Sequence, residues 1–436
     1  MKWRVIKMLD PNKVGEVIRK TRKEKGLRLE DLSDDQISPA TISNIERGIP
    51  HVKADKTVYL MDKIGIDSED LPNLIETYQV ERSETEIRLK AIECMIDAGK
   101  TKEALDQLKE IRESDHDPFG PTIYFLEGKG RQRENNWPKA ERAYFTAIQL
   151  ASKPEDRSNI EAASFNELGR CAFFQNRLDQ AIDFTESGLD AFNDKGDRTY
   201  YKHILLANKT TYLEKLGRLE EANRIIHEMW EDIETIKSLP VVLLLYKIRS
   251  NLYRKSKMYD DAVQCALEGI ELARINGDYD RTFDLWAVLG NTYLMCRKAD
   301  LAKTAFYTAL SLAHSMQVKN TTVNVYAQLG ALYMEEGQYL RAEAEIQKGI
   351  EIAREVRDHI SLSNALIVLG ECFIAQGKNK EAIYPLEEAL EISKKLKLEN
   401  QETRTLLLLS QAWEPLDEKK FTEYVRQLYK IEVDIV

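Results

Sequence analysis

Small residues recur at a spacing of about forty positions along most of the chain, each near the middle of a predicted helix. The recurring positions are Gly128, Gly169, Thr210, Ser250, Gly290, Gly330, Gly370 and Ser410. An alanine follows twelve residues after each of the first seven, at Ala140, Ala181, Ala222, Ala262, Ala302, Ala342 and Ala382. A pattern that stays in phase over this length predicts an array of similar structural units.

A glycine or a polar residue often stands seven positions after the small residue, where one helix must end and the next begin. Asn176, Gly217, Gly337 and Gly377 occupy this position. The pattern therefore predicts antiparallel helix pairs that approach closely at the small residues. One pair cannot bury its own apolar face, so the pairs are expected to stack into a superhelix with a concave inner wall.

Both ends of the array depart from this pattern. A degenerate unit around Gly99 and Ala104 is expected to open the array. Residues 403–436 are expected to close it as a cap, with Pro415 interrupting the repeat.

Shorter apolar patterns before the array predict a small helical domain. A helix over residues 14–25 ends at a glycine, and a second short helix carries Leu29 and Leu32. A third begins at Ser38 as its N-cap, has Pro39 at its first helical position and ends near Gly48. Two more helices are expected at residues 56–64 and 69–78.

Charge separates this domain from the array. The net charge of the chain is −10, yet residues 1–60 hold 13 Lys and Arg against 9 Asp and Glu, a balance of +4. The remaining residues carry 50 against 64, or −14. Because an acidic body repels phosphate backbones, contact with nucleic acid is expected from the N-terminal domain.

Other features point to a cytoplasmic protein without membrane contact. No apolar run approaches the ~18 residues that span a bilayer, and the first residues have no apolar segment of the secretory kind. The five cysteines are scattered singly, without a CxxC pair or a Cys/His cluster. This favours reduced thiols and argues against zinc and disulfides, so neither a metal nor a cofactor is expected.

Motifs of self-contained enzymes do not occur in a credible setting. The chain has no such GxSxG, HExxH, P-loop or GxGxxG motif, and its six histidines are isolated from one another. Catalysis by this chain alone is therefore not expected.

The repeats resemble the tetratricopeptide family, whose signature combines a small residue, an aromatic, a turn glycine and an alanine at these offsets. A clear example contains Gly330, Tyr333, Gly337, Tyr339 and Ala342. The period of about 40 residues exceeds the family's 34, which implies longer helices or loops. The resemblance covers roughly residues 84–430 and implies an all-α fold with a right-handed superhelix.

The run from Thr41 to Gly48, with the residues before it, resembles the helix-turn-helix of the phage-repressor (Xre/Cro) family. The preceding positions that agree are Gly15, Arg22, Gly26 and Leu32. The resemblance implies that the helix from Ser38 to Arg47 enters the major groove of double-stranded DNA. It places Pro39, Ala40, Ser43 and Asn44 against bases, and Ser38, Arg22, Arg47 and Lys53 near phosphates.

Three departures from this family affect the expected specificity. The turn over residues 34–37 is acidic and one residue shorter than usual, and Arg28 replaces the usual polar cap. Pro39 and Ala40 offer van der Waals contact, for example to thymine methyls, but no hydrogen bonds to bases. These features favour modest sequence specificity, with a retained structural module as the alternative.

In the tetratricopeptide family, the offsets −6, −3, −2 and +1 from the small residue face the inner wall. Here they imply a ladder of amides with two cations: Asn166, Arg170, Asn208, Lys247, Asn251, Asn291, Asn324, Gln328 and Asn364. An amide can donate to one backbone carbonyl of an extended peptide and accept from the next N–H. Lys247 or Arg170 would pair with a carboxylate. A solvated polar face is the alternative.

The combination of the two parts is similar to the Rap/NprR/PlcR/PrgX (RRNPP) peptide-pheromone quorum-sensing regulators of Gram-positive bacteria, and looks most like NprR. The resemblance implies a transcription regulator in which an imported signalling oligopeptide binds the inner wall and switches DNA binding and oligomer state. It implies a helix-turn-helix domain over 1–68, a linker helix over 69–83, and a solenoid with its cap over 84–436. A homodimer or higher homo-oligomer is expected.

Two other functions remain as alternatives to a peptide-binding regulator. Rap-like members of this group bind or dephosphorylate a response regulator of the sporulation phosphorelay, where a glutamine near the start of the array orients the attacking water. Gln79 is the nearest candidate by position, against the alternative of an exposed helix residue without a role. A scaffold without a small effector is the third function.

Overall fold

The computed structural model describes residues 9–113, 119–151, 157–316, 322–396 and 398–434. Every regular element in these ranges is a helix. The chain divides into two compact units, Met1–Asn135 and Asn136–Val436. None of the helices in the described ranges is long and apolar enough to cross a membrane.

The N-terminal core is built from short helices close to the expected ranges. They are α2 (Pro11–Glu24), α3 (Leu29–Leu32), α4 (Pro39–Glu46), α5 (Ala54–Ile64) and the start of α6 (Leu71–Asp97). Ile18, Ile42 and Leu60 are fully buried where their apolar faces meet. A Cβ on Gly15 of α2 would lie 2.5 Å from the carbonyl oxygen of Ile45 in α4. This close approach fixes α4 against α2 and requires glycine.

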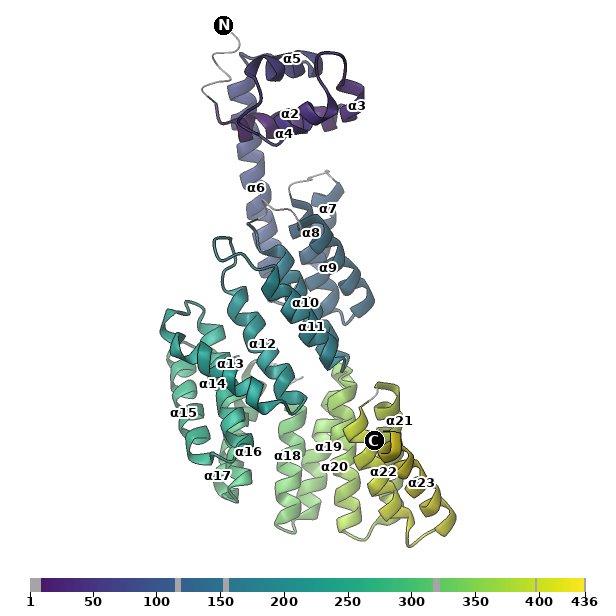
Figure 1. Ribbon diagram of the computed structural model, residues 1–436. Coiled ribbons are helices and arrows are strands. Elements are labelled where there is room, and N and C mark those ends of the chain that lie inside the picture. The colour runs from purple at the N-terminus through teal and green to yellow at the C-terminus, as the bar shows by residue number, and fades with distance from the viewer. Residues whose placement is uncertain (1–8, 114–118, 152–156, 317–321, 397, 435–436) are drawn as a thin grey trace. The chain divides into compact units, whose positions relative to one another are not determined.

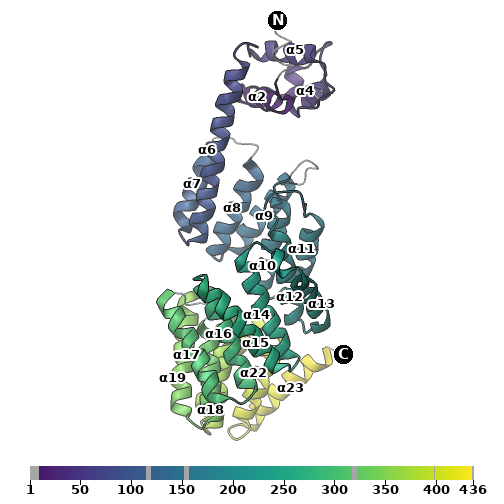
Figure 2. The ribbon, with the colours of Figure 1, turned by 90° about the vertical axis from the view of Figure 1, so that its left-hand side faces the viewer.

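Helix α6 joins this core to the first helices of the array without a break. Figure 2 shows it leaving α2, α4 and α5 and continuing beside α7 (Thr101–Glu113) and α8 (Gly120–Arg133). Arg82 in its middle donates to Glu16 of α2 at 2.7 Å, and Lys20 of α2 pairs with Glu81. The boundary expected near residue 84 thus falls inside one continuous helix.

The second unit is a succession of helices that follow one another side by side (Figure 1). The described elements are α9 (Trp137–Ala151), α10 (Ile160–Phe174), α11 (Leu178–Asp190), α12 (Tyr201–Lys215), α13 (Leu219–Glu231), η2 (Ile233–Thr235), α14 (Leu239–Lys255), α15 (Tyr259–Ile275), α16 (Tyr279–Met295), α17 (Ala299–Met316), α18 (Thr322–Glu335), α19 (Tyr339–Val356), α20 (His359–Ala375), α21 (Asn379–Leu396), α22 (Glu399–Trp413) and α23 (Glu418–Asp434). Pro415 lies in the turn between α22 and α23.

The recurring small residues lie where the two helices of a pair approach most closely. A Cβ on Gly290 of α16 would come within 2.5 Å of the Phe306 ring in α17. Ala302 and Ala342, twelve residues after their small residues, are fully buried. The helix pairs are therefore α10–α11 and each successive pair up to α22–α23.

The first helix of each pair forms one layer of the unit. Consecutive first helices, such as α14 and α16 or α18 and α20, contact each other directly. In the described part of the chain, no two consecutive second helices have a comparable contact. The more closely spaced layer is the inner one, so side chains on α10, α12, α14, α16, α18, α20 and α22 line the inner wall.

Candidate functional site

The inner wall carries polar side chains that are joined from one repeat to the next. On α10, Asn166 is buried, and its amide donates to Glu167 at 2.9 Å. Asn208 of α12 donates in turn to the Asn166 carbonyl oxygen at 2.8 Å. Asn166 therefore links two repeats from within the protein and has little surface to offer a ligand, whereas Asn208 is partly exposed.

Arg170, the first expected cation, is matched by one carboxylate. It donates to Glu167 at 2.8 Å, and its side chain is 44% exposed while that of Glu167 is 5% exposed. The negative charge of Glu167 raises the pKa of Arg170 above its already high value. The guanidinium faces the inner wall with its charge balanced on the same helix.

Lys247, the second expected cation, takes part in a three-residue cluster between α14 and α16. Its Nζ donates to Oδ2 of Asp284 at 2.8 Å, and Nη1 of Arg281 donates to the same oxygen at 3.1 Å. Asp284 is 16% exposed, whereas each cation is 30% exposed. Two cations here share one carboxylate.

The remaining amides differ in whether their side chains already form hydrogen bonds within the protein. Asn364 of α20 donates to Asn324 of α18 at 3.4 Å, which repeats the Asn208–Asn166 link. Asn251 accepts from Arg254 at 3.3 Å. No side-chain hydrogen bond joins Asn291 or Gln328 to another of the described residues, and both are partly exposed.

The charged partners on this wall were not among the residues predicted from the sequence. Asp284 and Arg404 occupy the same inward offset as Asn324, six residues before the small residue. Arg404 of α22 forms two hydrogen bonds with Glu371 of α20, each of 2.8 Å. Reading that offset for every residue type, and not only for amides and cations, would have found Asp284.

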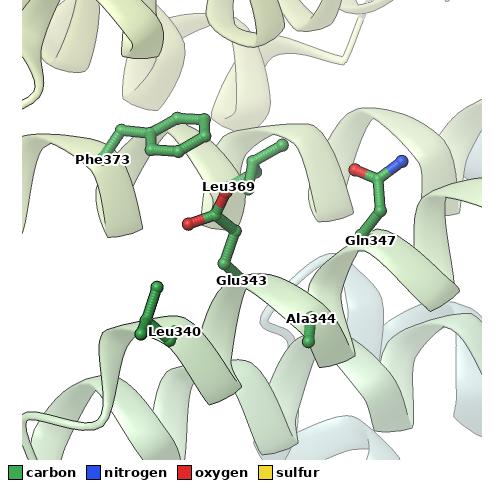
Figure 3. A pocket seen from close by; sticks show the side chains of 6 residues that line it. All are labelled: Leu340, Glu343, Ala344, Gln347, Leu369 and Phe373. Atoms are coloured by element: carbon green, nitrogen blue, oxygen red, sulfur yellow. The ribbon is translucent and has the colours of Figure 1, made fainter.

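A shallow cavity of about 420 Å³ lies between α19 and α20. Figure 3 shows Leu369 and Phe373 of α20 and the α19 residues Leu340, Glu343, Ala344 and Gln347 around it. One of its two walls is a second helix, and none of the inner-wall amides lines it. It is therefore separate from the polar strip.

In the N-terminal domain, the start of α4 is open to solvent. Ser38, Pro39 and Ala40 are exposed, and Ser43 and Asn44 are partly exposed on the same helix. The Ser38 hydroxyl accepts from the Thr41 backbone N–H at 3.2 Å, which makes it the N-cap that the sequence predicts. Arg47 and Lys53 are exposed at the end of α4 and the start of α5.

Arg22 differs from the expected phosphate contact. Its guanidinium donates to both carboxylate oxygens of Glu46, at 2.6 and 3.0 Å, and to the Leu27 carbonyl at 2.6 Å. The side chains of Arg22 and Glu46 are only 11% and 6% exposed. We correct the expectation because Arg22 is committed to an internal ion pair that joins α2 to α4.

The acidic turn before α4 is held by residues of α5. Asp34 accepts from Lys63 and from the Tyr59 hydroxyl, each at 2.6 Å. These two hydrogen bonds lower the pKa of Asp34 well below its usual range. Lys56 donates to the Gln36 carbonyl at 2.7 Å. The shortened turn is thus fixed by a charged network and has a defined conformation.

Gln79 is partly buried on α6, next to the residues that join α6 to α2. Lys20 of α2 lies 5.5 Å from the ring centre of the adjacent Tyr78.

The cysteines and acidic residues form no metal site in the part of the chain that is described, where no three of the usual ligands gather. Burial raises the pKa of Cys171 and of Cys265 to about 12. Both thiols are therefore protonated at neutral pH and are poor nucleophiles.

Comparison with known proteins agrees with this architecture. The family model described as Tetratricopeptide repeat matches residues 321–395. No curated protein matches the sequence. Among solved structures, a Rap protein complexed with Competence and Sporulation Factor has a TM-score of 0.58 and 15% identity, over 81% of this chain and 98% of that one.

Two further solved structures are similar over most of this chain. The apo form of the quorum sensor NprR from B. thuringiensis has a TM-score of 0.55 and 14% identity, over 75% of this chain and 94% of that one. A signal-transduction ATPase (STAND) with a tetratricopeptide repeat sensor from Pyrococcus horikoshii has a TM-score of 0.53 and 15% identity, over 97% and 64%. The chain thus has the all-helical tetratricopeptide superhelix that its repeats predicted.

Proposed function

We propose that the protein is a cytoplasmic regulator that binds a signalling oligopeptide along its inner wall and double-stranded DNA through its N-terminal helices. The observation that carries the proposal is the strip of partly exposed amides on successive first helices. Asn251 of α14 and Asn291 of α16 each follow the small residue of their repeat by one position, and Gln328 of α18 stands two positions before the small residue of the next repeat. An extended peptide presents alternating donors and acceptors that such a strip can bind.

The similar structures support a signalling ligand. The Rap structure contains Competence and Sporulation Factor, and NprR is described as a quorum sensor. At 15% and 14% identity these likenesses concern the fold, so the ligand class proposed here rests on the amides of this chain.

The proposed DNA binding is supported by the geometry of α4. Its N-terminal residues are exposed, its base is fixed by Gly15 and by the Arg22–Glu46 pair, and Arg47 and Lys53 flank it. A helix presented in this way fits the major groove, with its first residues against base edges. In a homodimer, two copies of α4 would reach successive major grooves.

Helix α6 offers a route by which the two activities could be linked. It is held to α2 through Arg82–Glu16 and Lys20–Glu81, and it also packs on α7 and α8. A change in the stacking of the first repeat would therefore move a helix that bears directly on the DNA-binding core.

The proposal is tested with the full-length protein in two selections. A pool of random-sequence DNA duplexes is expected to yield an enriched operator, and a pool of synthetic seven-residue peptides is expected to yield retained members. The affinity for the operator should then change when a retained peptide is added. Retention of no peptide would contradict the inner-wall function, and failure to enrich any duplex would contradict the DNA-binding function.

A further inference from the structure

The cluster of Lys247, Arg281 and Asp284 is unlike the other ion pairs of the inner wall. Lys247 reaches across from α14 to α16, and Arg281 lies one turn before Asp284 on α16. Both cations donate to a single oxygen, Oδ2 of Asp284, at 2.8 and 3.1 Å. The three side chains therefore leave one positive charge unmatched within the cluster.

Three other cations of this wall each form an ion pair with a single carboxylate. Lys255 of α14 pairs with Glu214 of α12 at 3.2 Å. Arg404 pairs with Glu371 through two hydrogen bonds, and Arg170 pairs with Glu167. In none of these three pairs does a second described cation form an ion pair with the same carboxylate, as happens at Asp284.

Both cations also have N–H groups left that can donate to a second acceptor. An ammonium has three donors and a guanidinium five, and each donates once to Asp284. Both side chains are 30% exposed, about twice the exposure of the carboxylate that they share. The two cations are therefore more accessible to solvent than the carboxylate that they share.

The cluster lies in line with the amide strip. Lys247 is one helical turn from Asn251 on α14, and Asp284 is two turns from Asn291 on α16. A chain bound along these amides would pass next to the two cations.

We propose that Lys247 and Arg281 form a carboxylate-binding subsite that fixes the position of the oligopeptide along the inner wall, with Asp284 as an internal competitor. This rests on the proposed peptide-binding function and adds to it the chemistry of the ligand and the place where it is anchored. The ligand carries a carboxylate, from its C-terminus or from an acidic side chain. The N–H groups of Lys247 and Arg281 that do not donate to Asp284 donate to this carboxylate. Charge-assisted hydrogen bonds of this kind are the strongest that an exposed groove can make.

Asp284 competes with the ligand carboxylate for the two cations, which a purely structural ion pair would not do. As an acceptor for both cations, it lowers their attraction for a second carboxylate. The change Asp284→Asn removes this negative charge and is therefore expected to strengthen binding, whereas loss of either cation weakens it.

The experiment uses immobilised full-length protein and three pools of random seven-residue peptides. The first pool has free C-termini and no Asp or Glu, the second has amidated C-termini and contains Asp and Glu, and the third has neither source of carboxylate. Retained peptides are quantified by mass spectrometry. The first two pools distinguish a terminal carboxylate from a side-chain carboxylate.

We expect the wild-type protein to retain one of the first two pools at least tenfold more strongly than the third. Lys247→Met and Arg281→Met should each reduce this retention about tenfold, and Asp284→Asn should raise it at least threefold. Lys255→Met is the matched control, because it removes a cross-helix lysine from the same helix α14 at a one-to-one pair. Its retention should equal that of the wild type.

Equal retention of all three pools by the wild type would overturn the subsite while leaving peptide binding in place. A loss of retention in Asp284→Asn as large as that in Lys247→Met would also overturn it, because the cluster would then be only a structural link. Retention of none of the pools would instead contradict the proposed peptide-binding function itself.

Discussion

The Ser250 hydroxyl donates a hydrogen bond of 2.7 Å to the carbonyl oxygen of Ala262, twelve residues along the chain in the partner helix. The same spacing brings a Cβ built on Gly169 to 3.2 Å from the Ala181 oxygen. A Cβ on Gly330 would lie 3.3 Å from the Ala342 oxygen. In these three repeats the small residue and the alanine thus mark the contact between the two helices, and a larger side chain at either position would overpack it.

The first prediction concerns this contact. Ala342→Leu should overpack the α18–α19 pair and lower the free energy of unfolding by about 1–3 kcal/mol. Denaturant titration of the full-length protein measures the change. Ala344→Leu is the control, since Ala344 is exposed on the same helix. Equal stability of Ala342→Leu and wild type would show that the alanine does not mark the helix contact.

The repeat architecture was predictable because its signal lies within the sequence itself. Small residues and alanines keep a fixed spacing, and each spacing reports a contact within one helix pair. The links between repeats were not predictable in the same way. Whether Lys247 meets Asp284, 37 positions later, depends on how α14 and α16 pack, and periodicity within one pair does not determine this.

Arg22 illustrates a second limit of the sequence. Basic residues near a predicted DNA-binding helix suggest phosphate contacts, yet an arginine can equally be buried beside a carboxylate. Glu46, 24 positions away, decides the outcome because its two oxygens accept both N–H groups of the guanidinium. Only the packing of α2 on α4 places that carboxylate next to Arg22.

The second prediction follows from this pair. Arg22→Ala should leave the Glu46 carboxylate buried and unpaired, and should destabilise the N-terminal domain by about 3–5 kcal/mol. Thermal unfolding without DNA measures this effect. Arg47→Ala, at an exposed position, should leave the unfolding temperature within about 1 °C of the wild type, consistent with a surface change of a few tenths of a kcal/mol. An Arg22→Ala protein of normal stability but weak DNA binding would restore the phosphate role.

The third prediction concerns pH. Hydrogen bonds from Lys63 and Tyr59 hold the pKa of Asp34 well below its usual range in the folded state. Its stabilisation is therefore fully present above the unfolded pKa of about 4, and it is lost as the pH falls further toward the folded pKa.

Asp34→Asn should consequently be less stable than wild type at pH 7, and the difference should shrink between about pH 4 and pH 3. Thermal unfolding at pH 7, 5, 4 and 3 measures it. Asp35→Asn, an exposed neighbour in the same turn, is the control. A stability difference for Asp34→Asn that is constant over this range would mean that the network does not depend on the charge of Asp34.

The fourth prediction separates the roles of two residues of the proposed DNA-binding surface. Asn44→Ala should reduce discrimination between the operator and its single-base variants by about 1–3 kcal/mol at one position. Arg47→Ala should weaken binding to all sequences and flatten the dependence on salt by about one unit of slope. Fluorescence anisotropy at several salt concentrations measures both. If neither change alters binding, this face of α4 does not contact DNA.

The last prediction concerns the amides that are still available on the inner wall. Asn291 makes no side-chain hydrogen bond to another described residue, so Asn291→Ala should remove only contacts with a ligand. Loss of one amide leaves a peptide N–H or carbonyl unpaired in a partly buried groove, at a cost of about 1–3 kcal/mol. The affinity for a peptide retained from the synthetic pool should fall roughly tenfold to hundredfold, since about 1.4 kcal/mol corresponds to one decade.

Asn251→Ala should weaken binding to a similar extent, while Asn276→Ala provides the control. Asn276 is exposed at the end of α15, a second helix, and its amide donates to the Leu272 carbonyl at 2.8 Å. Isothermal titration calorimetry of the three variants, with unfolding temperatures measured in parallel, distinguishes lost ligand contacts from lost stability. Unchanged affinity in both Asn291→Ala and Asn251→Ala would place the peptide away from the inner wall. In that case the cavity between α19 and α20 becomes the next surface to test, because Leu340 in its wall is 79% exposed.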